Sequence, residues 1–136
     1  MPDGAELADP KTKTILIVDD DESVLNLLEI LIKRDGFRIE LAATGQEALE
    51  KLKRRHDALV LDLMLPGSTS GFGVLKELDA LPPPVPPVII VTAFGHTKEV
   101  QEVQKNHHVV AFLHKPINQD KLLGSLHKTL RTQPPK

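Results

Sequence analysis

The segment that decides the fold reads ALVLDLML at residues 58–65, where Asp62 is the only charged residue among apolar neighbours. The four apolar residues before it have the length of a short strand buried on both faces. Burying a carboxylate beside such a run costs several kcal/mol unless a partner compensates for its charge. An acid in this position is often only a helix cap or a turn residue, so its meaning depends on what the chain places beside it.

Three other apolar runs also end in polar residues. ILIV at 15–18 leads into Asp19 and Asp20, VIIV at 88–91 into Thr92, and VVAFLH at 109–114 into Lys115. Amphipathic segments lie between these runs. This alternation predicts βαβ units and a parallel sheet that is covered on both faces.

Five segments carry apolar residues at helical spacing. Their predicted buried faces are Val24, Leu27, Leu28 and Leu31; Ala48, Leu49 and Leu52; Phe72, Val74, Leu75 and Leu78; Val100 and Val103; and Leu122, Leu123, Leu126 and Leu130. Gly36 is expected to end the first helix, and the basic residues within 51–55 to end the second. With residues 38–41 as a further strand, the sequence predicts an α/β fold, a doubly wound sheet of five parallel strands with five helices.

The segments outside this pattern are predicted to be irregular. Residues 82–87 read PPPVPP, which cannot join a helix or an inner strand and so predicts an extended connector. Residues 1–13 and 132–136 are polar and without periodicity, so they are expected to be flexible tails around one domain at residues 14–131.

Composition excludes several classes of function. The 136 residues suit one domain, and 17 basic against 19 acidic residues give a formal net charge of -2 without a basic stripe. Direct binding of nucleic acid is therefore not expected. Cysteine is absent, and the apolar runs are far shorter than a membrane span. Without a secretory-signal pattern, a soluble cytoplasmic protein is the expectation.

In a doubly wound sheet, functional groups collect at the carboxyl ends of the strands. This edge is expected to hold Asp19, Asp20, Asp62, Thr92 and Lys115. Three carboxylates close together repel one another, so a hard divalent cation such as Mg²⁺ is expected between them. Asp62 could then attack phosphorus as a nucleophile, with Lys115 and the Thr92 hydroxyl binding the phosphoryl oxygens.

The chain resembles the CheY-like receiver domains of two-component response regulators over about residues 14–131. The motifs that carry the resemblance are ILIVDD at 15–20, DLMLPG at 62–67, VTA at 91–93 and KP at 115–116. The family implies a flavodoxin-like fold of strand order 2-1-3-4-5 and a cis peptide bond before Pro116.

The resemblance also implies a role for each matching residue. Asp62 would accept the phosphoryl group, and Lys115 would bind it. Mg²⁺ would be held by Asp19, Asp20, Asp62 and the backbone carbonyl of Met64. Thr92 and Phe112 would form a switch. Met64 and Phe94 would flank the path of the hydrolytic water, and as bulky apolar residues they predict slow self-dephosphorylation.

The implied function is phosphorelay signalling rather than an enzyme activity beyond the domain's own phosphorylation and dephosphorylation. The expected donor is a sensor histidine kinase or a phosphotransfer protein. A downstream protein effector would read the surface of the fourth helix, fifth strand and fifth helix, and this surface could also support a homodimer. No membrane partner is expected.

Two segments depart from the common family pattern. The loop at residues 67–71 is one residue longer, and Asn106-His107-His108 replaces a small turn that contains glycine. His107, His108 and His114 lack the ligand spacing of a zinc site and are interpreted as solvated or satisfied histidines.

Two alternative functions compete with phosphorylation. The first is a degenerate receiver that acts as a phosphorylation-independent interaction module, which the intact set of acids, threonine and lysine argues against. The second is a phosphatase or nucleotide-binding domain on a similar sheet. A haloacid-dehalogenase-like phosphatase needs an acid where this chain has Met64, and a nucleotide binder needs a glycine-rich loop where this chain has acids.

Overall fold

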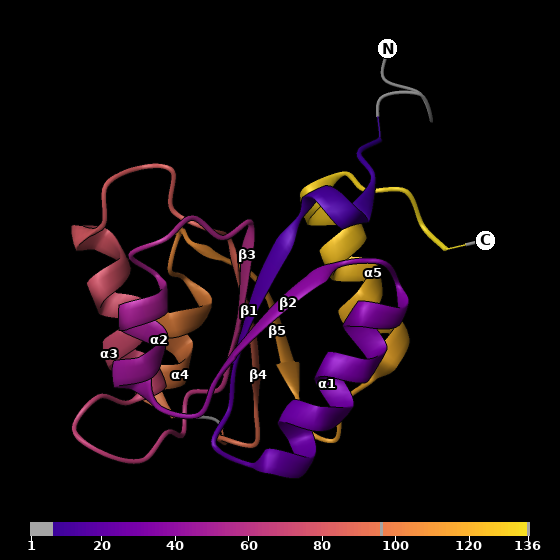
Figure 1. Ribbon diagram of the computed structural model, residues 1–136. Coiled ribbons are helices and arrows are strands. Elements are labelled where there is room, and N and C mark those ends of the chain that lie inside the picture. Colours follow the sequence, from indigo (N-terminus) through magenta and orange to yellow (C-terminus); the bar gives the residue numbers. More distant parts are fainter. Residues whose placement is uncertain (1–6, 96, 136) are drawn as a thin grey trace.

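The computed structural model describes residues 7–95 and 97–135, which form one parallel sheet with helices on both faces (Figure 1). The strands are β1 (Thr14–Val18), β2 (Arg38–Ala42), β3 (Ala58–Leu61), β4 (Val88–Thr92) and β5 (Val109–His114). Their order is β2-β1-β3-β4-β5, and every neighbouring pair is parallel. The predicted doubly wound, flavodoxin-like topology is confirmed.

Helices cover the sheet on both sides. They are α1 (Glu22–Arg34), α2 (Gly45–Lys51), α3 (Gly71–Glu77), α4 (Lys98–Gln104) and α5 (Gln119–Leu130), with short 3₁₀ turns η2 (Pro10–Thr12) and η3 (Leu78–Ala80). Figure 1 shows α1 and α5 on one face and α2, α3 and α4 on the other. Among the described residues, no helix is both long and apolar enough to cross a membrane.

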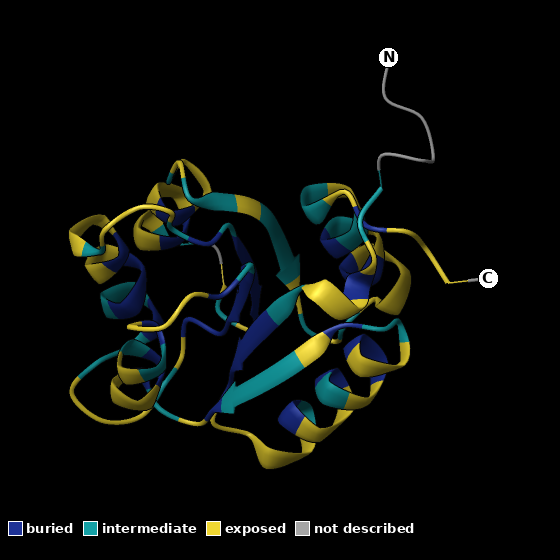
Figure 2. Ribbon diagram, turned by 45° about the horizontal axis from the view of Figure 1, so that its top comes forward, coloured by how far each residue is buried: buried dark blue, intermediate teal, exposed yellow. Residues whose placement is uncertain are grey.

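The core consists of two apolar layers, one on each face of the sheet. Along β1, Ile15 and Ile17 pack in the layer under α1 and α5, while Leu16 and Val18 pack in the layer under α2, α3 and α4. Figure 2 shows the central strands as the most buried part of the molecule. Burying one such side chain stabilises the fold by about 1.5–3 kcal/mol, so the core fixes the strand ends that carry the polar residues.

The buried face of α1 differs from the predicted one. The buried residues are Leu25, Leu28, Leu31 and Ile32. Leu27, which was predicted to be buried, is 47% exposed, and Val24 is only partly buried. Because this helix is rich in aliphatic residues, several spacings of three and four fit the same sequence, and its contact with the sheet selects among them.

The helix ends follow their local chemistry. A polar N-cap side chain accepts backbone N–H bonds at the start of each α-helix: Asp21, Thr44, Ser70, Thr97 and Asn118. Gly36 follows α1 with a φ of +106°, a conformation that L side chains rarely adopt. The predicted stop at this glycine is confirmed, and residues 82–87 contain neither helix nor strand, as expected.

The described part of the predicted tails is not free of the domain. Ala8 forms a parallel bridge with Thr132, and its N–H donates to the carbonyl oxygen of Arg131 at 2.8 Å. Asp9 caps η2, in which Pro10 is buried. The described parts of the two predicted tails therefore contact each other at Ala8 and Thr132, their flexibility stays a prediction, and residues 1–6 lie outside the described part.

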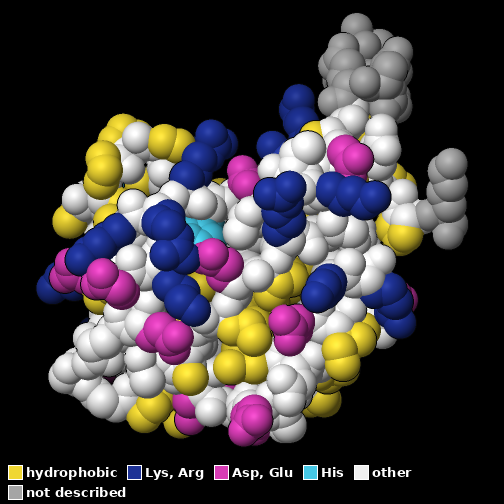
Figure 3. Space-filling view, in the orientation of Figure 1, with side chains coloured by type: hydrophobic (Ala, Val, Ile, Leu, Met, Phe, Trp, Pro, Cys, Tyr) yellow, Lys and Arg dark blue, Asp and Glu magenta, His cyan; other side chains and the backbone are white. Residues whose placement is uncertain are grey.

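Surface charge agrees with the absence of a basic stripe in the sequence. On the face seen in Figure 3, basic and acidic side chains are interspersed. Among the described residues, charged side chains also form ion pairs, including Arg54 with Glu40 at 2.7 Å and Lys51 with Glu47 at 3.3 Å. Neither sign dominates this face.

Candidate functional site

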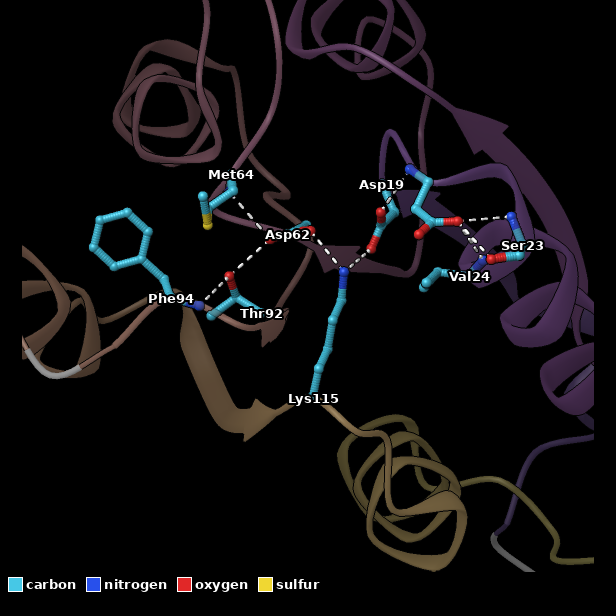
Figure 4. Close-up of polar contacts among 9 residues, drawn as sticks. Asp19, Ser23, Val24, Asp62, Met64, Thr92, Phe94 and Lys115 are labelled. Carbon is cyan, nitrogen blue, oxygen red and sulfur yellow. Dashed lines mark hydrogen bonds and ion pairs between the residues drawn. The ribbon is translucent and has the colours of Figure 1, made fainter.

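The polar residues predicted to meet do so at the carboxyl edge of the sheet (Figure 4). Asp62 follows β3 directly and is only 4% exposed. Asp19 follows β1, Thr92 ends β4, and Lys115 follows β5. The order of the strands places β3 between β1 and β4, which puts Asp62 at the centre of the group.

Three donors surround the Asp62 carboxylate. Its Oδ1 accepts hydrogen bonds from the Thr92 hydroxyl at 2.7 Å and from the Met64 backbone N–H at 3.0 Å. Its Oδ2 accepts from the Lys115 ammonium at 2.9 Å. These bonds compensate for burial, which explains how an acid is accommodated at the end of an apolar strand.

Lys115 joins two buried carboxylates. Its Nζ lies 2.7 Å from Asp19 Oδ2 and 2.9 Å from Asp62 Oδ2. Burial raises the pKa of the Asp19 carboxyl, and the hydrogen bond from Lys115 opposes this shift without cancelling it. Burial acts to lower the pKa of Lys115, but hydrogen bonds to Asp19 and Asp62 outweigh it and hold that pKa above its ordinary value. Lys115 is therefore a fixed cation within the acidic group.

Two neighbouring acids have different roles. Asp20 is exposed, and its carboxylate lies within 4.8 Å of those of Asp19 and Asp62. Asp21 instead caps α1 by accepting from the N–H groups of Ser23 and Val24. Asp19 Oδ1 accepts from the Asp21 N–H at 2.9 Å, so the loop between β1 and α1 helps to orient the Asp19 carboxylate.

This donor set suits a hard divalent cation. Asp19, Asp20 and Asp62 offer only oxygen ligands, which Mg²⁺ prefers, and the exposed side of Asp20 leaves room for water. Lys115 compensates part of the negative charge, so the acidic group can also exist without an ion.

A hollow of about 580 Å³ opens beside Asp62. Met64, Phe72 and Phe94 line its apolar side, while Asp20, Asp62 and Lys115 line its polar side. Phe94 meets Phe72 edge-on, with ring centroids 5.3 Å apart. Helical periodicity placed Phe72 only on the buried face of α3, so its position in the hollow was missed.

The two predicted switch residues lie on the neighbouring strands β4 and β5, where Thr92 pairs with His114 and Phe112 with Ile90. Thr92 is fully buried and already donates to Asp62. Phe112 is half-buried in β5 and packs against the core layer under α2, α3 and α4, and it is not among the residues that line the hollow. The Lys115–Pro116 peptide bond is cis, as the resemblance implied.

Gly71 packs tightly against the backbone of the Asp62 loop. A Cβ at this position would overlap with the Asp62 carbonyl oxygen and the Leu63 Cα. We expect Gly71→Ala to lower the free energy of unfolding by about 2–3 kcal/mol, because the loop must move to admit the methyl group. Denaturant unfolding measures this change.

Gly124→Ala is the matched control. Nothing lies within 4 Å of a Cβ built at Gly124, which is inside α5. This change should stabilise the fold by up to about 1 kcal/mol, as alanine does in a helix. Equal unfolding curves for the Gly71 variant and the unchanged chain would contradict the tight contact.

Comparisons with known proteins agree with this geometry. The family model for the response regulator receiver domain matches residues 15–127. The transcriptional regulatory protein ZraR of Escherichia coli O157:H7 is 36% identical over 116 residues, which cover 85% of this chain and 26% of ZraR. The chain thus spans about a quarter of the length of this relative.

Solved structures extend the similarity to three dimensions. A CheY-like receiver domain protein from Methanospirillum hungatei JF-1 has a TM-score of 0.79 at 28% identity, covering 87% of this chain and 93% of that one. The response regulator TrrA from Thermotoga maritima, solved in complex with Mg(2+)-BeF, has a TM-score of 0.74 at 28% identity and covers 87% and 99%.

Proposed function

Because the chain belongs to the family of response regulator receiver domains, a signalling family of two-component systems, we propose that it accepts a phosphoryl group on Asp62. The observation that supports this proposal best is the Asp62 carboxylate itself, which is buried at the edge of an open hollow and surrounded by fixed donors. One carboxylate oxygen forms the new bond to phosphorus while the bond from phosphorus to the donor group breaks.

The surrounding residues stabilise the charge that this transfer moves. Lys115, now shared by Asp19 and Asp62, would pair with a phosphoryl oxygen. The Thr92 hydroxyl, now bonded to Asp62, would donate to a second one. We assign Mg²⁺ to Asp19, Asp20, Asp62 and the backbone carbonyl of Met64, where it would neutralise negative charge between the carboxylates and the phosphoryl group.

Phosphorylation should require the cation. Incubation with acetyl phosphate and Mg²⁺ is expected to add one phosphoryl group per chain, and a chelator should prevent this addition because the acids would then repel the incoming anion. Intact-protein mass spectrometry measures the product. A phosphorylated product of equal yield in chelator would refute the magnesium site.

Two adjacent aspartates provide a matched comparison. Asp20→Asn removes a proposed ligand from an exposed position, so the Mg²⁺ concentration needed for phosphorylation should rise by about tenfold or more. Asp21→Ala removes the α1 cap instead, so it should cost about 1 kcal/mol of stability and leave the Mg²⁺ requirement unchanged. A higher Mg²⁺ requirement in Asp21→Ala but not in Asp20→Asn would show that Asp20 is not the ligand.

We propose that the signal leaves through the surface of α4, β5 and α5. A phosphoryl group on Asp62 would take over the Thr92 hydroxyl, and β5 pairs with β4 next to Thr92, where Thr92 lies opposite His114. Phe112, two residues earlier in β5, would repack in response and shift this surface between two states.

This switch predicts a localised change in dynamics. Phosphorylation should alter amide hydrogen exchange within residues 92–114, because this segment contains Thr92 and Phe112. The exchange of α1 and β2, which contain no switch residue, should stay the same. Exchange that is identical in the two forms across residues 92–114 would argue against the switch and would leave the phosphorylation proposal standing.

The proposed partners follow from this function. A sensor histidine kinase or a phosphotransfer protein would supply the phosphoryl group, and a protein effector or a second copy of the chain would bind the surface of α4, β5 and α5. A degenerate receiver is disfavoured, since Thr92 and Lys115 both donate to Asp62 and Lys115 also pairs with Asp19. A cytoplasmic location stays a prediction from the sequence.

A further inference from the structure

A second group of side chains that could bind a metal ion lies at the opposite edge of the sheet from Asp62. Asp79 belongs to η3, while His107 and His108 form the turn between α4 and β5. The carbonyl oxygen of His108 accepts from the N–H of Val88, the first residue of β4, whereas Asp62 follows the last residue of β3. The two sites are therefore separated by the length of the sheet.

The distances suit a tetrahedral transition-metal ion. His108 Nε2 lies 2.8 Å from Asp79 Oδ1, and His107 Nε2 lies 3.9 Å from the same oxygen. Every pair of the three ligand atoms is within 4.8 Å. Zn²⁺ bonds of about 2.0–2.1 Å place tetrahedral ligand atoms about 3.4 Å apart, and the two measured distances lie on either side of this value. Small rotations of the side chains would admit an ion.

The backbone around the two histidines is fixed. Asn106 Oδ1 accepts from the His108 N–H at 2.8 Å, and the Asn106 carbonyl accepts from the Val109 N–H at 3.1 Å. The His108 side chain is 13% exposed, while that of His107 is 76% exposed, and their ring centroids are 3.9 Å apart. Both imidazoles are thus presented on one rigid turn.

The third ligand, Asp79, follows a residue that is anchored in the core. Leu78, the residue before Asp79, is fully buried and anchors η3 in the core layer under α2, α3 and α4. The Asp79 side chain is exposed, which leaves space for water to complete the coordination of an ion. A metal would therefore find two rigid attachment points that already face each other.

We propose that Asp79, His107 and His108 form a site for a transition-metal ion of the Zn²⁺ class. Two imidazoles and one carboxylate favour such ions over Mg²⁺ or Ca²⁺, which take oxygen ligands almost alone. The ion would replace the hydrogen bond between His108 and Asp79 and would tie η3 to the turn before β5. This inference does not depend on phosphorylation.

Competition between the 136-residue chain and a chromophoric zinc chelator tests the site, with excess Mg²⁺ present to occupy the acids near Asp62. The expected result is one bound Zn²⁺ per chain. Asp79→Asn and His108→Gln should each weaken this binding by about tenfold or more. Asp79 is exposed, so its variant should fold as the unchanged chain does, which a melting curve verifies.

Two controls match these changes in chemistry. Glu77→Gln removes an exposed acid from the end of α3, and His114→Gln removes a histidine outside the cluster. Both should bind Zn²⁺ as the unchanged chain does. Binding that survives Asp79→Asn, or that falls equally in Glu77→Gln, would overturn the proposal. Binding that is abolished by Asp20→Asn would place the ion at the other edge and would also overturn it.

Discussion

Replacing Asp62 with asparagine is expected to abolish phosphorylation of this chain by acetyl phosphate or by a donor phosphohistidine. The side-chain amide has no anionic oxygen to attack phosphorus, and no other carboxylate in the described residues has the same set of donors around it. Intact-protein mass spectrometry after incubation with donor and Mg²⁺ should therefore show only the unmodified chain.

The asparagine variant should still fold, which makes the result interpretable. Its amide oxygen can accept from the Thr92 hydroxyl and the Met64 N–H in place of Oδ1, while Lys115 keeps its bond to Asp19. Asp120→Asn, an exposed acid in the first turn of α5, is the matched control and should be phosphorylated normally. A phosphoryl group on the Asp62 variant would show that another residue is the acceptor.

The site could be predicted from the sequence because each of its residues ends a strand. Asp19, Asp62, Thr92 and Lys115 follow or close apolar runs, and parallel strands bring their carboxyl ends to one edge regardless of loop details. The strand pattern alone thus predicts which side chains meet.

Contacts between elements could not be predicted in this way. His108 and Asp79 are 29 residues apart, and their hydrogen bond depends on how η3 docks against the turn before β5. The sequence spacing of the histidines argued against a zinc site, because spacing along the chain cannot show that Asp79 lies beside His108. The bridge between Ala8 and Thr132 likewise joins two segments that are distant in the sequence.

The hydrogen bond of the Thr92 hydroxyl could not be predicted from the sequence either. The pattern predicted Thr92 at the site but not that its hydroxyl donates to Asp62 Oδ1. The proposed switch therefore consists of an exchange of acceptors by a fixed, fully buried residue, which requires little motion of β4 itself.

Changing Met64 to asparagine and Phe94 to glutamate together should accelerate loss of the phosphoryl group by about tenfold or more, a barrier decrease of about 1.4 kcal/mol. Both residues line the hollow beside Asp62, where Met64 is 54% exposed and Phe94 is held edge-on against Phe72. Water must approach phosphorus opposite the Asp62 oxygen, and neither side chain can orient it by a hydrogen bond. The unchanged chain should therefore hold its phosphoryl group for a long time, as suits a response to sustained conditions.

The decay of the phosphorylated protein after donor removal measures this effect. Met64→Leu with Phe94→Leu is the matched control, since it alters both side chains but keeps them apolar and bulky, so its decay should equal that of the unchanged chain. The contact between Phe94 and Phe72 also allows a purely structural role, in which Phe94 only supports the loop after β4. In that case the polar double variant would decay at the unchanged rate and only its melting temperature would fall. Faster dephosphorylation of the polar double variant at saturating Mg²⁺, with the leucine variant unaffected, would show that access of water to the mouth of the hollow sets the phosphoryl lifetime.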